Sequence, residues 1–183
     1  MRRIAIVGPA GSGKTTLARQ LADGLGLTHI ELDHLYHRSG WREVPPEQFR
    51  TDLVAAMAAA SGGWVVCGNY QSRAQGLHTG AADTIVWLDL PRRTVMRRLI
   101  LRTVRRTVTR EKLFGYDMVE PLANFYRWDP NHNIVRGAWV HFDRYRESYG
   151  HRMTDGCWDH RRAPPLLTRR RRRFPGRCHQ NQS

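Results

Sequence analysis

Short apolar runs alternate with amphipathic segments along most of the chain. The apolar runs, rich in β-branched residues, predict buried strands at 3–7, 28–32, 64–67 and 84–90. Apolar residues recurring at helical spacing predict helices at 14–24, 46–60, 92–107 and around 134–145. Between 33 and about 44 we expect a loop rich in His, Tyr and Trp. This alternation predicts an α/β fold, with a parallel sheet covered by helices on both faces.

The turn after the first predicted strand carries the most specific motif. Residues 8–15 read Gly-Pro-Ala-Gly-Ser-Gly-Lys-Thr, which matches G-x-x-x-x-G-K-[ST] between a strand and a helix. Both flanks argue against a chance glycine-rich turn, so we interpret it as a phosphate-binding loop (P-loop) for a nucleoside triphosphate. The expected nucleotide-binding residues are Gly8, Pro9, Ala10, Gly11, Ser12, Gly13, Lys14, Thr15 and Thr16. Lys14 is expected to reach the β- and γ-phosphates, and Thr15 to ligate Mg²⁺.

Further segments carry a resemblance to a known family. They are the P-loop, Glu31-Leu32-Asp33-His34-Leu35-Tyr36, Gly40-Trp41, the block 64–70 that ends in Gly-Asn-Tyr, and Trp87-Leu88-Asp89-Leu90-Pro91-Arg92. Together they resemble the adenylate-kinase-related P-loop kinases often labelled DNA topology modulation proteins, over residues 1 to about 155. The resemblance implies a three-layer P-loop NTPase fold of the nucleoside/nucleotide-kinase type, with ATP as the phosphoryl donor.

One position departs from that family. An Asp commonly precedes its Gly-Asn-Tyr block, where this chain has Cys67. An acid there would organise the magnesium shell beside the P-loop, which a thiol cannot do as an oxygen ligand. Catalytic competence therefore depends on another carboxylate.

Two carboxylates and one arginine are candidates for the rest of the site. Asp33, at the end of the second strand, is expected to be catalytic and to bind the acceptor, either accepting a proton from it or organising the magnesium water. Asp89 ends the run Ile85–Asp89 and is expected as a metal ligand. Arg73 is expected to bind the acceptor. The structural alternatives are a cap or loop role for Asp33, a turn role for Asp89 and a solvated loop position for Arg73.

The helix predicted at 92–107 combines an inward face with a basic face. Val95, Leu99 and Val104 are expected to face inward. Arg98, Arg102 and Arg105, at i, i+4 and i+7, share one face, where they would offset the charge of the transferred phosphoryl group, or form a solvated surface. We choose Arg102 as the catalytic residue and expect a lid over about 92–130.

Charge and composition then divide the chain. Lys and Arg number 30 against 16 Asp and Glu, a formal net charge of +14. Half of it lies in residues 159–183, so we expect a kinase-like domain at 1–158 and a basic, disordered tail that touches nucleic acid only non-specifically, if at all. Three scattered cysteines form no metal or disulfide spacing. With no long apolar run and no signal peptide, a cytoplasmic protein without membrane contact is expected.

These features favour a small-molecule kinase. It would transfer the γ-phosphoryl group of ATP, with Mg²⁺, to a nucleotide, a nucleoside or a similar small acceptor. A guanine-reading motif and a second transporter-type signature are both absent from the sequence, which argues against a GTPase switch and a transporter ATPase. The remaining alternative is a catalytically weak, regulatory nucleotide-binding protein, which Cys67 and the basic tail would suit. The sequence leaves the acceptor and the oligomeric state open.

Overall fold

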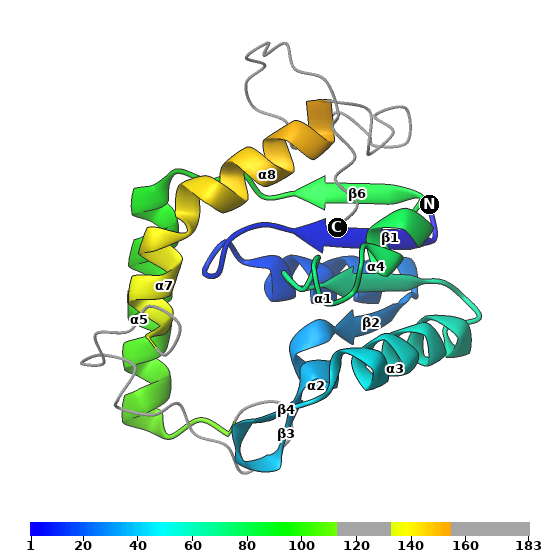
Figure 1. The fold of residues 1–183 in the computed structure, drawn as a ribbon, viewed down its shortest axis with the longest axis horizontal. Coiled ribbons are helices and arrows are strands. Elements are labelled where there is room, and N and C mark those ends of the chain that lie inside the picture. The colour runs from blue at the N-terminus through cyan, green and yellow to red at the C-terminus, as the bar shows by residue number, and fades with distance from the viewer. Residues whose placement is uncertain (113–132, 155–183) are drawn as a thin grey trace.

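A four-stranded parallel sheet organises the protein, whose computed structural model describes residues 1–112 and 133–154 (Figure 1). Its strands are β1 (Arg3–Val7), β2 (Thr28–Glu31), β5 (Trp64–Cys67) and β6 (Thr84–Trp87), in the order β2-β5-β1-β6. All neighbouring strands pair in parallel, so their carboxyl ends meet at one edge of the sheet.

Helices cover both faces of this sheet. Helix α1 (Lys14–Leu25) buries Ala18 and Ala22 against Ile4, Ile6 and Val65 on one face. On the opposite face, α3 (Pro46–Ala59) buries Phe49 and Leu53 against Ile30 and Val66, and α4 (Leu77–Ala81) packs beside it. These layers confirm the predicted three-layer α/β architecture.

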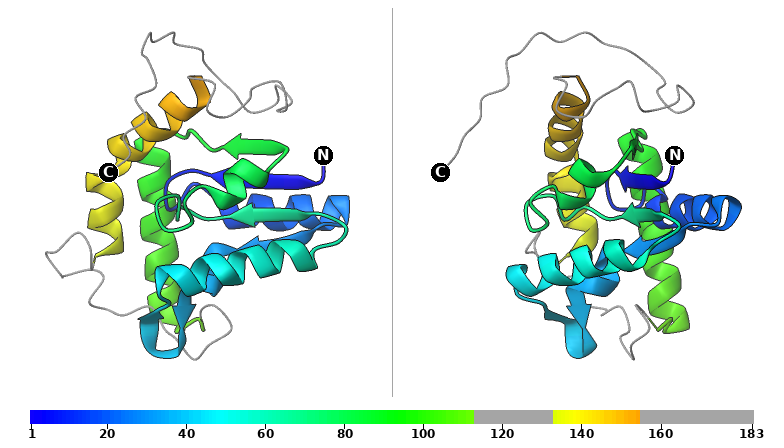
Figure 2. Two further views of the ribbon diagram at one scale, coloured as in Figure 1. Left: turned by 45° about the vertical axis from the view of Figure 1, so that its right-hand side comes forward. Right: turned by 90° about the vertical axis from the view of Figure 1, so that its right-hand side faces the viewer.

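Three later helices enclose the carboxyl edge and one side of the sheet. Helix α5 (Arg92–Thr109) runs across the carboxyl ends of the strands, with α7 (Ile134–Val140) beside it, as Figures 1 and 2 show. Helix α8 (Phe142–Thr154) lies along β6, and its buried Tyr149 packs against Val7 on the side of the sheet opposite α1. Tyr149 also donates a hydrogen bond to Asn69 Oδ1 at 3.2 Å, which ties α8 to the loop after β5.

The structure corrects several element boundaries. The predicted loop at 33–44 contains a short helix, α2 (Leu32–Tyr36), followed by a hairpin of β3 (His37–Arg38) and β4 (Arg42–Glu43), joined by the 3₁₀ turn η1 (Ser39–Trp41). Strand β2 therefore ends at Glu31 rather than at 32, and β6 ends at Trp87 rather than at 90. Such short elements span too few residues to show a periodicity.

The helical predictions near the carboxyl edge also need correction. The segment predicted as one helix around 134–145 is two helices, which meet at His141. On α5, Val95 and Leu99 are buried as predicted, but Val104 is exposed and Thr103 is buried in its place. The helix keeps its apolar contact over its first two turns, where the sheet lies, and less beyond them.

Part of the predicted organisation lies outside the described residues. The proposed boundary at 158 and the tail at 159–183 do so entirely, and the proposed lid at 92–130 is described only as far as 112. Within the described ranges, no helix is both long enough and apolar enough to cross a membrane.

Candidate active site

Residues 8–15 form a tight loop between β1 and α1, in which glycine is required at two places for different reasons. Gly13 caps α1 in the left-handed region, with φ of 93°. Gly11, with φ of 83°, lies against α5, and a Cβ there would come within 2.7 Å of the Val95 carbonyl oxygen. The loop is therefore held between the helix that it starts and the helix that crosses above it.

Lys14 folds back onto this loop. Its ammonium group donates hydrogen bonds to Gly8 O at 2.8 Å and to Pro9 O at 2.9 Å. Burial lowers the pKa of Lys14 to about 8, although the nearby carboxylates of Asp33 and Glu31 raise it. The lysine therefore lies close to both acids and carries its charge at neutral pH at an energetic cost that an anionic ligand would relieve.

Thr15 is in contact with an acid that the sequence analysis did not select. Its hydroxyl donates to Glu31 Oε1 at 3.1 Å, and Cys67 Sγ lies 3.9 Å from the same hydroxyl. Glu31 and Cys67 are register partners on β2 and β5. The carboxylate beside the P-loop threonine thus comes from β2, the strand next to the one that carries Cys67 in place of the family's usual Asp. The sequence analysis missed Glu31, because the register that places it opposite Cys67 is visible only in the folded sheet.

Cys67 itself has an unreactive thiol. Its side chain is buried, and this burial, with Glu31 nearby, raises the pKa of the thiol to about 12. His29 Nε2 lies 3.3 Å from the sulfur, but burial lowers the pKa of His29, so the imidazole carries no charge that would stabilise a thiolate. At neutral pH the thiol stays protonated, which argues against a nucleophilic role.

Asp33 was expected at the end of the second strand, but it lies in the first turn of α2, two residues after β2 ends at Glu31. It accepts a hydrogen bond of 2.6 Å from the Tyr70 hydroxyl, which comes from the loop after β5. Burial and the Asp33 charge raise the pKa of Tyr70, so this hydroxyl remains a donor. Asp33 therefore lies near Lys14 and is fixed by a residue 37 positions further along the chain.

Arg73 takes part in an arrangement of its own. Its guanidinium pairs with Glu43 Oε2 at 3.3 Å and lies over the Tyr36 ring, 4.7 Å from the centroid. The contacts of Arg73 thus join the β3–β4 hairpin to α2. We call the surroundings of Asp33, namely α2, the hairpin, α3 and the loop after β5, the acceptor side, and residues 8–15 with the arginines of α5 the donor side.

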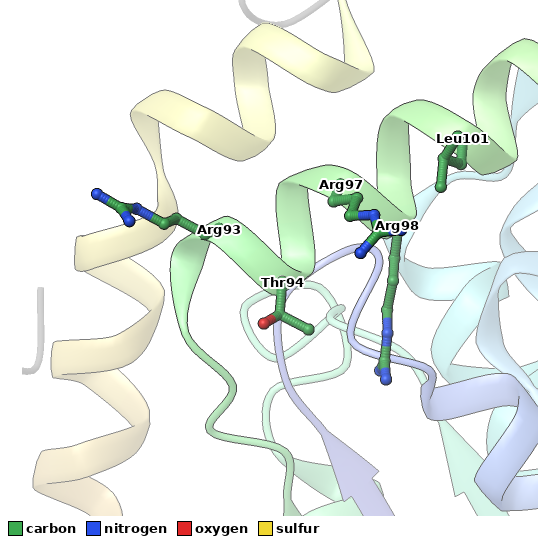
Figure 3. A pocket seen from close by; sticks show the side chains of 5 residues that line it. All are labelled: Arg93, Thr94, Arg97, Arg98 and Leu101. Carbon is green, nitrogen blue, oxygen red and sulfur yellow. The ribbon is translucent and has the colours of Figure 1, made fainter.

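The basic face of α5 lies on the donor side. Arg98 Nη1 donates to Ser12 O at 3.5 Å, and the Arg102 charge is close enough to Lys14 to lower its pKa. Beside them is an open pocket of about 440 Å³. It is lined by Arg93, Thr94, Arg97, Arg98 and Leu101. In Figure 3 Arg98 points toward the P-loop and Arg93 points away from it. Arg105 instead pairs with Glu111 at 3.0 Å.

Asp89 makes its described contacts elsewhere. It lies beyond the end of β6 and accepts two hydrogen bonds from Arg146 of α8, at 2.9 and 3.1 Å. Among the predicted site residues, the structure thus brings together Lys14, Thr15, Asp33 and Arg102, and it places Asp89 and Arg73 in ion pairs of their own.

Known proteins match parts of this chain. The family model for cytidylate kinase matches residues 4–61. A shikimate kinase of Synechococcus elongatus is 31% identical over 112 residues, which cover 51% of this chain and 55% of that protein. A cytidylate kinase of Oleidesulfovibrio alaskensis is 34% identical over 65 residues, covering 32% of this chain and 30% of that protein. The matched parts of this chain are similar to small-molecule kinases. It spans about half, or less, of the length of these curated relatives.

Among solved structures, two kinases show a low similarity to this chain. A shikimate kinase from Acinetobacter baumannii in complex with shikimate has a TM-score of 0.44 and 21% identity, covering 80% of this chain and 79% of that one. A gluconokinase from Sinorhizobium meliloti 1021 has a TM-score of 0.38 and 20% identity, covering 81% and 96%. Because these scores are low, the fold rests on the strand order and the P-loop of this chain itself. The family match at 4–61 includes Lys14, Glu31 and Asp33, but not Tyr70 or Arg73.

Proposed function

We propose that this protein is an ATP-dependent kinase that transfers the γ-phosphoryl group of ATP to a small acceptor molecule. The observation that carries the proposal is the contact between a complete P-loop and a carboxylate from the next strand, Thr15 to Glu31 at 3.1 Å, with Asp33 close to Lys14. Phosphoryl transfer needs cations and a metal on the donor and a base near the acceptor, and these residues offer both.

On the donor side, residues 8–16 would bind the triphosphate. The Lys14 ammonium group would give up its hydrogen bonds to the two loop carbonyls and donate to phosphate oxygens instead. Arg98 and Arg102 would stabilise the negative charge that develops on the phosphoryl group in the transition state. The oxygen ligands that Mg²⁺ prefers are present in Thr15 and Glu31, so we propose Glu31, in place of Asp89, as the acid that organises it. Bound there, Mg²⁺ would neutralise charge on the β- and γ-phosphates.

On the acceptor side, Asp33 would receive the proton of the attacking group, and Tyr70 would hold the carboxylate in place. Arg73 would contact the acceptor only by competing with Glu43. The relatives are named as a cytidylate kinase and a shikimate kinase, which are two different acceptors, so they do not choose the acceptor of this chain.

Finer assignments remain proposals of the sequence. They are membership of the family labelled DNA topology modulation proteins, a kinase-like domain at 1–158, a lid over 92–130, a cytoplasmic location, and non-specific contact of the basic tail with nucleic acid. The regulatory alternative rested on Cys67 and the basic tail. Glu31 weakens the first of these supports, because an acid is present beside Thr15.

The test is a phosphoryl-transfer screen with the full chain. Radiolabelled ATP and Mg²⁺ are incubated with nucleoside monophosphates, nucleosides, sugars and hydroxy acids, and labelled products are separated. We expect label on at least one acceptor. If ATP binds tightly and no acceptor is labelled, the kinase proposal is wrong and a regulatory nucleotide-binding role replaces it.

A further inference from the structure

The arginines on the acceptor side are largely neutralised by the protein itself. Arg38 pairs with Asp52 at 2.8 Å, Arg50 with Glu47 at 2.6 Å, and Arg73 with Glu43 at 3.3 Å. The remaining arginine of this region, Arg42, is exposed and donates to the carbonyl of Ser39 at 3.4 Å. In the described part of the acceptor side, a phosphate dianion would therefore have to compete with these carboxylates for the arginines, and it would also meet the negative charge of Asp33.

The pair of Arg73 and Glu43 is the one that matters most, because it lies against the aromatic residues beneath Asp33. The guanidinium is stacked on Tyr36, whose ring lies 4.7 Å from that of Tyr70. A phosphate on the acceptor would have to displace Glu43 from this stacked arginine and would lie near the Asp33 charge. Both effects oppose binding of a phosphorylated acceptor.

Aromatic packing restrains the Asp33–Tyr70 pair. Phe49, fully buried, packs against both tyrosines, with ring centroids 5.4 Å from Tyr70 and 5.7 Å from Tyr36. Tyr70 therefore has little freedom to turn away, and its hydrogen bond occupies Asp33 Oδ1. Oδ2 is the oxygen left to accept a proton from an attacking group.

A base held in this way favours one class of acceptor. A phosphate monoester has a second pKa of about 6 and is already ionised at neutral pH, so it attacks without losing a proton. A hydroxyl group must lose its proton as it attacks, and a positioned carboxylate accelerates that step. The fixed base and the paired arginines thus point the same way.

We propose, on the basis of the kinase function above, that the acceptor is a hydroxyl compound without a phosphate group, and that the Glu43–Arg73 pair excludes phosphorylated acceptors. In the reaction the acceptor oxygen forms a bond to the γ-phosphorus while the bond from that phosphorus to the bridging oxygen of ADP breaks. The hydroxyl proton passes to Asp33 Oδ2, and ADP leaves with the bridging oxygen.

The experiment compares matched acceptors. Nucleosides, sugars and hydroxy acids are each offered beside their monophosphates at equal concentration, with ATP and Mg²⁺, and kcat/KM is measured. We expect at least one phosphate-free compound to exceed its phosphorylated partner by tenfold or more. Faster transfer to a monophosphate than to every phosphate-free compound would overturn this inference and leave the kinase function standing. No transfer to any compound would overturn both.

A variant separates the ion pair from the rest of the pocket. Glu43→Gln releases Arg73, so the ratio of kcat/KM for the phosphate-free acceptor to that for its monophosphate should fall about tenfold. Glu147→Gln, an exposed change on α8, is the matched control and should leave the ratio unaltered. An equal ratio in Glu43→Gln and in the unmodified chain would show that the pair does not determine specificity.

Discussion

The donor side and the acceptor side of this site are built in opposite ways. Most of the donor side is one run of consecutive residues, 8–15, whose shape depends on backbone conformation and on glycine at positions such as 11 and 13. The acceptor side is assembled from side chains of α2, the β3–β4 hairpin, α3 and the loop after β5. The first can be recognised as a motif, whereas the second exists only after folding.

The two sides differ in charge as well. On the donor side, Lys14, Arg98 and Arg102 converge on the loop, and burial lowers the pKa of Lys14 and so destabilises its charged form. On the acceptor side, arginines and carboxylates are paired with one another. The difference suggests that one side is made to receive a polyphosphate and the other a less charged molecule, and three experiments sharpen it.

Replacing the base should separate the two sides most strongly. In Asp33→Asn the carboxylate is lost while the P-loop remains, so turnover should fall by about 100-fold or more, with the Kd for ATP unchanged. Steady-state ADP release and calorimetry measure the two quantities. Asp23→Asn, an exposed change on α1, is the control and should retain full turnover. A parallel loss of ATP binding would mean that Asp33 belongs to the donor side.

Removing the acid beside Thr15 should affect the metal. Glu31→Gln is expected to weaken Mg²⁺ binding, so the Mg²⁺ concentration that gives half of the maximal turnover should rise about tenfold. Asp89→Asn, whose carboxylate pairs with Arg146, should change that concentration little. The reverse result, with Asp89→Asn the more sensitive variant, would restore the sequence-based assignment of Asp89.

A pH titration of ATP binding tests the lowered pKa of Lys14. The free protein loses this charge as the pH rises through about 8, whereas bound phosphates would keep the lysine protonated to higher pH. The Kd for ATP should therefore rise about tenfold between pH 7 and 9. The comparison is with Lys14→Ala, in which this dependence should vanish. A constant Kd over this range in the unmodified chain would contradict the role of Lys14 in binding.

Local signals explain how much of this was predictable. The P-loop, β1 and α1 followed from adjacent residues, because a strand, a glycine turn and a helix each leave a pattern of their own. Asp33 was selected as a residue, but its element was wrong, since five residues of α2 cannot show a helical period.

Long-range contacts account for what the sequence did not reveal. Glu31 lies beside Thr15 because β2 and β5 pair in a register that places it opposite Cys67, and the hydrogen bond from Tyr70 to Asp33 joins segments 37 residues apart. Asp89 shows the converse. A strand-like run ending in an acid resembles a metal-binding strand, but the acid pairs with Arg146 of α8, 57 residues further along the chain. No local pattern encodes any of these pairings.

The central claim is that residues 8–15 hold a nucleoside triphosphate through Lys14. Calorimetric titration of ATP with Mg²⁺ into the unmodified chain, Lys14→Ala and Lys112→Ala tests it most directly, because these are the only two lysines in the sequence. We predict saturable binding at one site in the unmodified chain and in Lys112→Ala, and an affinity at least about tenfold weaker in Lys14→Ala. Equal affinity in all three proteins would contradict the assignment of the donor side.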